Sequence, residues 1–168
     1  MGWYNADGLY VKFSTEEAAP GLVGGYNTRG PRQMIEVFLS ETKLTGLSAT
    51  AGVTVLDYNA VLPKNTHIEK ITVIAEKACT GVGAVLNLGL IKTDLATELD
   101  YNGLVAAIPL ASVDTIGETT ELVVGSTYAG ALIGTVLTEN GYFVADYDTA
   151  AFTAGSLRIR IEYTRDLT

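Results

Sequence analysis

The side chains best suited to catalysis or metal binding are scarce in this sequence. His67 is the only histidine and Cys79 the only cysteine. A catalytic triad needs a histidine beside a nucleophile and an acid, and a structural zinc site commonly uses closely spaced Cys or His pairs. Neither can be assembled here. We expect His67 to be an ordinary loop or strand-edge residue, and Cys79, which ends an apolar stretch, to be a buried, unreactive thiol.

Two groups of oxygen-bearing side chains have the chemistry to bind calcium, an ion that takes about six to eight oxygen ligands. The first group is the run Asp94, Glu98, Asp100 and Asn102. The second is the pair Asp146 and Asp148, which we expect to lie in a solvent-exposed loop. The run does not have the spacing of an EF-hand loop. We therefore predict no metal site.

The segment Gly81-Val82-Gly83 has part of the spacing of a nucleotide-binding loop. That loop needs a third glycine and a following helix, whose N-terminus holds the phosphate. Here the third glycine is missing and a strand is expected next, so the segment is interpreted as a turn. A glycosidase would need two carboxylates across a cleft, and no pair stands out. The sequence therefore predicts neither an enzyme nor a cofactor.

The composition excludes further partners. The net charge of -8 argues against binding a phosphate backbone, which requires clustered Lys and Arg. No stretch approaches the roughly 20 apolar residues of a membrane span, and the N-terminus lacks the basic and apolar regions of a signal peptide. We expect no nucleic-acid partner, no membrane partner and synthesis in a reducing cytoplasm.

The elements that position these residues are predicted to be strands. Residues 61–94 indicate two strands joined by a Gly-rich turn, one over 67–78 and one over 84–91. In the second strand Leu86, Leu88 and Leu90 share a face, which is typical of a strand with one buried side. The last strand, 155–163, alternates in the same way, with Leu157 and Ile159 facing inward and Arg158 outward.

Other segments complete the predicted fold. Strands are expected over residues 33–39, 51–56, 118–124 and 127–137, with Val53 and Val55 on one face of the second of these. Asn102-Gly103 predicts a turn, followed by a short helical turn over 104–108 that Pro109 ends. Asn140-Gly141 predicts a hairpin with a type I′ turn. The result is an all-β antiparallel sandwich, with the jelly roll favoured and other Greek-key sandwiches left open.

The first 31 residues differ from the rest. They are rich in Gly, contain Pro20 and Pro31, and carry aromatics without clustered aliphatics. We interpret residues 1–31 as an extended arm, bent at Gly24-Gly25, and residues 32–168 as a single sandwich domain. The arm aromatics are predicted anchors in grooves of a partner subunit, with folding back onto their own domain as an equal alternative. These aromatics are Trp3, Tyr4, Tyr10, Phe13 and Tyr26.

Tyrosine is the most frequent aromatic, with nine Tyr against four Phe and one Trp. Exposed aromatics on a sandwich can hold sugar rings, and Tyr142 and Tyr147 are the candidates for such a face. Tyrosine is also favoured at protein interfaces, since it buries area and keeps a polar tip. We favour a protein interface over sugar binding.

Three segments together resemble head-decoration and other accessory structural proteins of tailed bacteriophages. They are residues 62–66 (LPKNT) leading into 68–73 (IEKITV), residues 85–90 (VLNLGL), and the closing strand 157–163 (LRIRIEY). The opening MGWYNADGLYVKF is similar to the start of such proteins from marine podophages. The resemblance is a general one over residues 32–163 without an exact motif, and no site residues carry over.

That resemblance implies a decoration, or cement, protein on the capsid surface of a virion, made in the host cytoplasm. It implies a β-sandwich or jelly-roll subunit, commonly a homotrimer, whose partner is the major capsid protein. The alternative function is a head-fibre, tail or receptor-binding component with a carbohydrate-binding face.

Overall fold

The computed structural model describes residues 2–4, 10–12 and 32–165 of the chain. Two short strands near the N-terminus, β1 (Gly2–Tyr4) and β2 (Tyr10–Lys12), pair antiparallel. The remaining elements are β3 (Arg32–Leu39), α1 (Glu41–Thr45), β4 (Val61–Leu62), β5 (Thr66–Thr80), β6 (Val85–Lys92), β7 (Glu98–Pro109), a 3-10 turn (Leu110–Ser112), β8 (Thr119–Leu122), β9 (Gly141–Asp148) and β10 (Ala154–Arg165). None of the described helices is long and apolar enough to cross a membrane.

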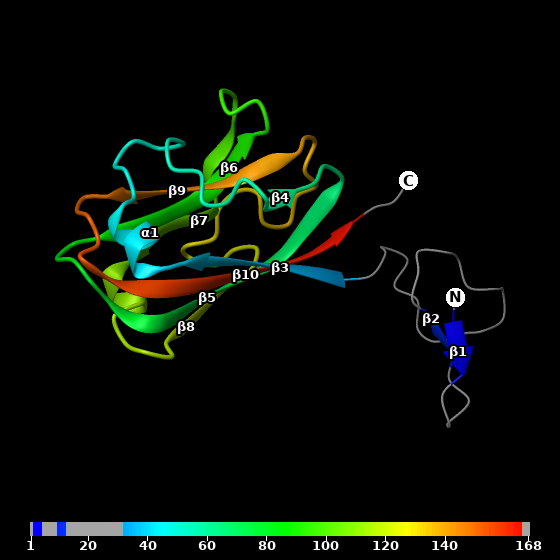
Figure 1. Ribbon diagram of the computed structural model, residues 1–168, viewed down its shortest axis with the longest axis horizontal. Coiled ribbons are helices and arrows are strands. Elements are labelled where there is room, and N and C mark those ends of the chain that lie inside the picture. The colour runs from blue at the N-terminus through cyan, green and yellow to red at the C-terminus, as the bar shows by residue number, and fades with distance from the viewer. Residues whose placement is uncertain (1, 5–9, 13–31, 166–168) are drawn as a thin grey trace.

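Eight strands form two packed antiparallel sheets, which confirms the predicted sandwich (Figure 1). One sheet has the order β3-β10-β5-β8 and the other β4-β9-β6-β7. The core lies between them. It includes Leu86, Leu88 and Leu90 from β6 and Leu157 and Ile159 from β10, all fully buried as their alternation predicted.

The pairing of the strands is that of one long antiparallel hairpin wound around this core. β3 pairs with β10, β4 with β9, β5 with β8, and β6 with β7. Two more pairings, β10 with β5 and β9 with β6, join these pairs into the two sheets. This nested order is the jelly roll, so the topology that the sequence pattern left open is resolved.

The turn predicted at Gly81-Val82-Gly83 is present, and Gly81 and Gly83 have φ of 139° and 77°. Such angles favour glycine because it has no Cβ. The two strands that the turn joins, β5 and β6, lie in opposite sheets. The turn therefore carries the chain across the sandwich. Among the strands of the sandwich, only β6 and β7 follow each other in the chain and also pair.

The strand predicted over residues 51–56 is wrong. The segment turns at Gly52, which has φ of 75°, and leaves Val53 63% exposed. It runs irregularly beside β9, where the Leu56 N–H donates to the Phe143 carbonyl at 2.9 Å. Because the turn at Gly52 divides the segment, only an isolated bridge forms with β9, between Val55 and Val144.

The turn predicted at Asn102-Gly103 and the helical turn over 104–108 are also wrong, because both lie inside β7. β7 pairs irregularly with β6 and carries Ala107 at φ of 57°. This irregularity brings its first part over Gly89 of β6, where a methyl group would lie 2.1 Å from the Asp100 carbonyl oxygen. Pro109 ends β7, and the 3-10 turn follows.

The strand predicted over 127–137 is absent, whereas the one predicted over 118–124 is β8. The Asn140-Gly141 hairpin is wrong because neither residue has a positive φ and Gly141 begins β9. The Asn140 side chain instead accepts a hydrogen bond from the Lys64 N–H at 2.8 Å. This contact joins the loops before β5 and β9.

Candidate interaction surface

The two residues with the most reactive side chains are both in β5. Cys79 is buried, as expected, and burial raises the pKa of its thiol to about 11. It therefore stays protonated at neutral pH. His67 lies near the start of the strand, in a β-bridge with Val136. No cluster of three or more His, Cys, Asp or Glu side chains in the described residues could hold a metal ion.

The acidic run, which begins in the turn after β6 and continues into β7, serves local structure. The Asp94 carboxylate accepts hydrogen bonds from the Thr97 hydroxyl at 2.6 Å and from the N–H groups of Ala96 and Thr97. The Thr97 hydroxyl and these two N–H groups lower the pKa of Asp94 to about 2. Asp94 is therefore an ionised turn-former. Glu98 and Asp100 likewise accept hydrogen bonds from nearby backbone N–H groups, those of Tyr101 and Asn102.

The pair Asp146 and Asp148 is not in a loop, which corrects the expectation. Both lie in β9, and Asp146 is only 4% exposed. Its Oδ1 accepts a hydrogen bond from Asn87 Nδ2 at 2.8 Å, and Asn87 Oδ1 accepts one from the Ala107 N–H at 2.8 Å. Burial raises the pKa of Asp146. Sequence reasoning missed this contact because it depends on the register of β6 with β9, which places Asn87 opposite Asp146.

The two tyrosines proposed for a sugar-binding face are on opposite sides of β9. Tyr147 is partly buried and packs against the hydrophobic core. Tyr142 stays partly exposed and meets Tyr58 edge to face, with ring centroids 5.8 Å apart. Tyr58 is 61% exposed. The structure therefore retains one small aromatic surface, formed by Tyr58 and Tyr142.

The predicted arm anchors cannot be placed. Trp3, Tyr4 and Tyr10 belong to β1 and β2, whose side chains the structure does not describe, and Phe13 and Tyr26 lie outside the described residues. Their role in binding a partner, and the domain boundary at residue 31, stay predictions. In the described chain the sandwich begins at Arg32, the first residue of β3.

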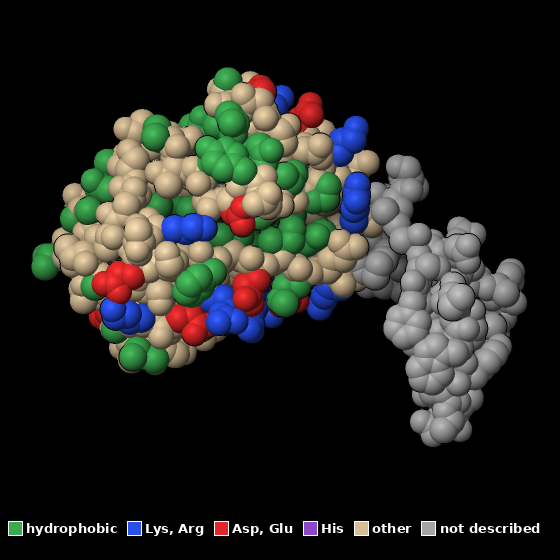
Figure 2. Space-filling model, viewed as in Figure 1, with side chains coloured by type: hydrophobic (Ala, Val, Ile, Leu, Met, Phe, Trp, Pro, Cys, Tyr) green, Lys and Arg blue, Asp and Glu red, His purple; other side chains and the backbone are tan. Residues whose placement is uncertain are grey.

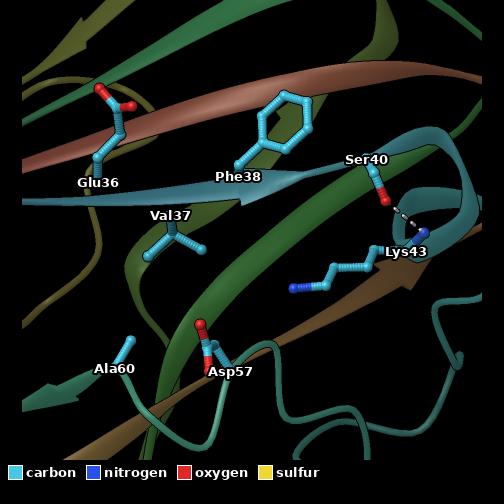
Figure 3. A pocket seen from close by; sticks show the side chains of 7 residues that line it. All are labelled: Glu36, Val37, Phe38, Ser40, Lys43, Asp57 and Ala60. Carbon is cyan, nitrogen blue, oxygen red and sulfur yellow. Dashed lines mark hydrogen bonds between the residues drawn. The ribbon is translucent and has the colours of Figure 1, made fainter.

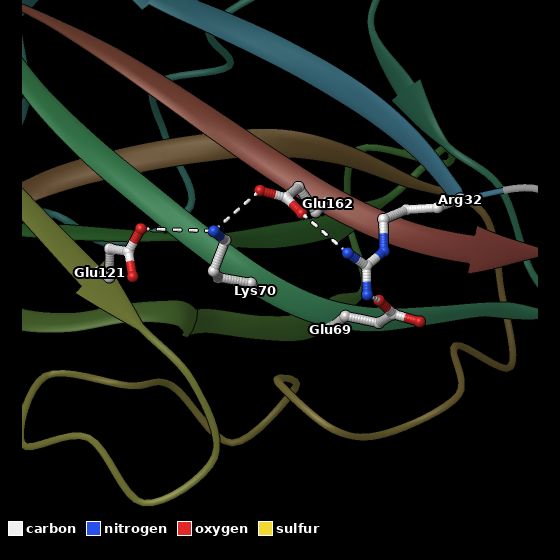
Figure 4. A network of polar contacts seen from close by, with 5 residues as sticks. All are labelled: Arg32, Glu69, Lys70, Glu121 and Glu162. Atoms are coloured by element: carbon white, nitrogen blue, oxygen red, sulfur yellow. Dashed lines mark hydrogen bonds and ion pairs between the residues drawn. The ribbon is translucent and has the colours of Figure 1, made fainter.

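The sheet β3-β10-β5-β8 carries a series of ion pairs on its outer side, and Figure 2 shows positive and negative side chains intermingled along the lower margin of the view, where this sheet lies. Arg32, at its margin, pairs with Glu69 at 2.6 Å and with Glu162 at 3.7 Å. Lys70 lies 3.1 Å from Glu162 and 3.3 Å from Glu121 (Figure 4). The hydrogen bond to Glu162, with a second to Glu121, raises the pKa of Lys70.

The ion pairs continue toward the other end of β10. The Glu36 carboxylate of β3 forms ion pairs with two arginines of β10: Oε1 lies 3.2 Å from Arg158 Nη1, and Oε2 lies 3.0 Å from Arg160 Nε. Solvent-exposed ion pairs contribute only about 0–1 kcal/mol each. They hold the surface side chains in a defined pattern, and a partner with complementary charges would gain specificity from that pattern more than affinity.

Two large apolar side chains interrupt these charges on β3: Met34 is 56% exposed and Phe38 is 48% exposed. Beside β3 lies an open groove of about 240 Å³ (Figure 3). The groove is lined by Glu36, Val37, Phe38, Ser40, Lys43, Asp57 and Ala60. We name Met34, Phe38 and this groove the β3 surface. It combines exposed apolar area with charge, as protein interfaces do.

Comparison with known proteins gives a fold relationship. No protein-family model matches the sequence, and no curated protein matches it. The structure is similar to a chain in the solved structure described as "Capsid of Ralstonia phage GP4", with a TM-score of 0.53 and 15% sequence identity. The similarity covers 91% of this chain and 92% of that chain. At this identity it establishes a shared fold, nearly end to end.

Proposed function

We propose that the chain is a structural protein of a tailed-phage virion, which binds the outer surface of the capsid and reinforces it. The observation that carries the proposal is the shared fold, which extends over 91% of this chain and 92% of a chain from a phage capsid structure. A jelly roll alone serves many functions, so the proposal also needs a suitable surface.

The β3 surface supports binding to another protein. Met34 and Phe38 offer apolar area, and the pairs made by Glu36 lie beside them. In this proposal the major capsid protein is the partner, the chain acts as a homotrimer, and the arm aromatics Trp3 and Tyr10 are among the anchors. Many weak contacts by an oligomer on a repeating lattice add up through multivalency.

The test is binding to assembled capsids that lack this protein. The full chain should bind assembled capsids more tightly than free capsid subunits, and decorated capsids should release DNA at a higher temperature. A chain that lacks residues 1–31 should lose binding while circular dichroism shows an unchanged β fold. If the shortened chain binds as well as the full one, the proposed role of the arm is wrong. If neither binds, the decoration role is wrong.

The second candidate is a head-fibre, tail or receptor-binding component that binds carbohydrate. The exposed edge-to-face pair of Tyr58 and Tyr142 favours it, since aromatic rings of this kind can stack on sugars. A glycan array distinguishes the two functions. Reproducible sugar binding that Tyr142→Ala abolishes would support the second candidate. An array that shows no binding would reject the second candidate and leave capsid decoration as the proposed function.

A further inference from the structure

Among residues 32–165, the sandwich has one long sheet edge without a strand beside it. β3 forms an end of its sheet, and among residues 32–165 no backbone hydrogen bond joins it to anything except β10. Such an edge presents a row of unpaired N–H and C=O groups that another extended segment can join. Proteins usually shorten, charge or cover their edges to prevent uncontrolled pairing.

The other edges of the described sandwich are either short or covered by a loop. β4 has only two residues and β8 four. The outer edge of β7 is covered by the loop that follows β8: Ala106 N–H donates to Tyr128 at 2.9 Å, and Leu132 N–H donates to Gly103 at 2.8 Å. β3, with eight residues, is the long exception within 32–165. Its exposed Phe38 makes it more apolar than a protected edge.

The groove of the β3 surface lies along this edge. In Figure 3, Val37 points toward the loop that carries Asp57 and Ala60. Lys43 Nζ donates to the Leu56 carbonyl at 2.8 Å, which ties that loop to α1. The groove therefore has a wall beside the edge strand, and side chains of an added strand would enter it.

We propose that the β3 edge binds residues 13–31 of a second copy of this chain, which add a strand to the sheet. Pro20 and Pro31 have no N–H to donate, so the pairing stretch falls between them and contains Leu22, Val23 and Tyr26. If Gly24-Gly25 is extended when bound, and not bent as the sequence suggests for the arm, residues 21–30 span about 33 Å, enough to cover an eight-residue strand of about 26 Å. The arm is thus long enough to cover the whole edge.

The sequence next to β3 favours a second copy over the same one. Covering its own edge would require the arm to reverse immediately before Arg32. Pro31 biases Gly30 toward an extended conformation, which opposes such a reversal. An arm that continues outward instead reaches a neighbour, and exchange of arms within a closed ring covers every β3 edge. The proposal needs no capsid and is tested on the isolated protein.

The first experiment maps the contact by photo-cross-linking. Phe38 is replaced by p-benzoylphenylalanine in an unlabelled full chain, which is unfolded and refolded together with an excess of ¹⁵N-labelled wild-type chain. Trypsin cuts after Lys12 and Arg29, so it releases residues 13–29 as one peptide. A cross-link to the ¹⁵N form of that peptide is expected. A cross-link to the unlabelled form alone, to another region, or to nothing would overturn the proposal.

The second experiment measures assembly of the full chain by light scattering after size exclusion. Phe38→Lys places a charge on the edge and should weaken self-association at least about ten-fold, because edge lysines oppose strand addition. The matched control is Val82→Lys, since Val82 is 96% exposed in the turn between β5 and β6. The control should assemble like wild type. A monomeric wild type, or equal assembly of both folded variants, would overturn the proposal.

Discussion

At the scale of single residues, Asp146 is the least well satisfied of the described carboxylates that the sequence singled out. One oxygen accepts the hydrogen bond from Asn87, and the other is buried without a hydrogen-bond partner in the described chain. Burial is the main cause of its raised pKa, and the negative charge of Asp148 adds to it, while the Asn87 hydrogen bond opposes it. The ionised form therefore makes the fold less stable than the protonated form does.

The pH dependence of stability follows from this pKa. A folded-state pKa above the ordinary value of 3.8 means that the folded chain holds the proton more tightly than the unfolded chain. The resulting stabilisation of the folded chain is complete below pH 3.8, the ordinary pKa, and is lost as the pH rises through the folded-state pKa. Asp146→Asn cannot ionise, so its stability relative to wild type should improve between about pH 4 and pH 7. Urea unfolding of both proteins at the two pH values measures this.

The control for Asp146 is Asp148→Asn, which removes the same charge from the exposed end of the same strand. Its stability relative to wild type should change less over that pH range. Equal pH dependence of the two variants would show that net charge, and not the burial of Asp146, controls the effect.

At the scale of elements, the sequence predicts best those strands that have one buried face over their whole length. β10 is such a strand: Leu157 and Ile161 face the core, while Arg160 and Glu162 carry the outer ion pairs. A period of two residues survives in the sequence wherever a strand separates core from solvent in this way. The turn from β5 to β6 was predictable for a different reason, because Gly81 and Gly83 accept the positive φ that the turn requires.

The elements that sequence reasoning missed depend on partners far away in the chain. β7 hides its alternation because its pairing with β6 shifts register between Leu88 and Leu90. The buried contact of Asn87 with Asp146 exists only through the register of β6 with β9, which no local pattern encodes. The β3 edge could not be foreseen either, because an edge is defined by which strands are absent beside it.

A glycine in β10 tests how tightly these elements pack. Gly155 lies where the register between β10 and β5 shifts, with φ of 121°, and a methyl group there would come 2.6 Å from Cα and Sγ of Cys79. Gly155→Ala should lower the free energy of unfolding by about 2–4 kcal/mol, through backbone strain and overpacking. Urea denaturation gives the value.

The matched control is Gly117→Ala. Gly117 also has a positive φ, of 82°, but nothing lies within 4 Å of the added methyl group. Only the backbone strain should remain, at about 1 kcal/mol. If the two variants lose the same stability, the close approach of β10 to Cys79 contributes nothing measurable.

At the scale of the whole molecule, the nested topology sets an order for folding. β6 and β7 are separated only by residues 93–97, whereas β3 must find β10 across nearly the whole sandwich sequence. Closing a longer loop costs more conformational entropy before the contacts it allows are made. We therefore expect the β6–β7 pair to form early and the β3–β10 pair to form after the folding transition state.

Two fully buried leucines test this order. Leu88 lies in β6 and Leu39 in β3, and both are 0% exposed. Replacement of either by Ala should cost about 2–5 kcal/mol of stability, because each leaves a cavity in the core. The loss should appear mainly as slower folding for Leu88→Ala and mainly as faster unfolding for Leu39→Ala. Stopped-flow measurements over a range of urea concentrations separate the two rates. The opposite result would be slower folding for Leu39→Ala and faster unfolding for Leu88→Ala. It would mean that β3 pairs with β10 before β6 pairs with β7, so that folding begins at the β3 side of the sandwich.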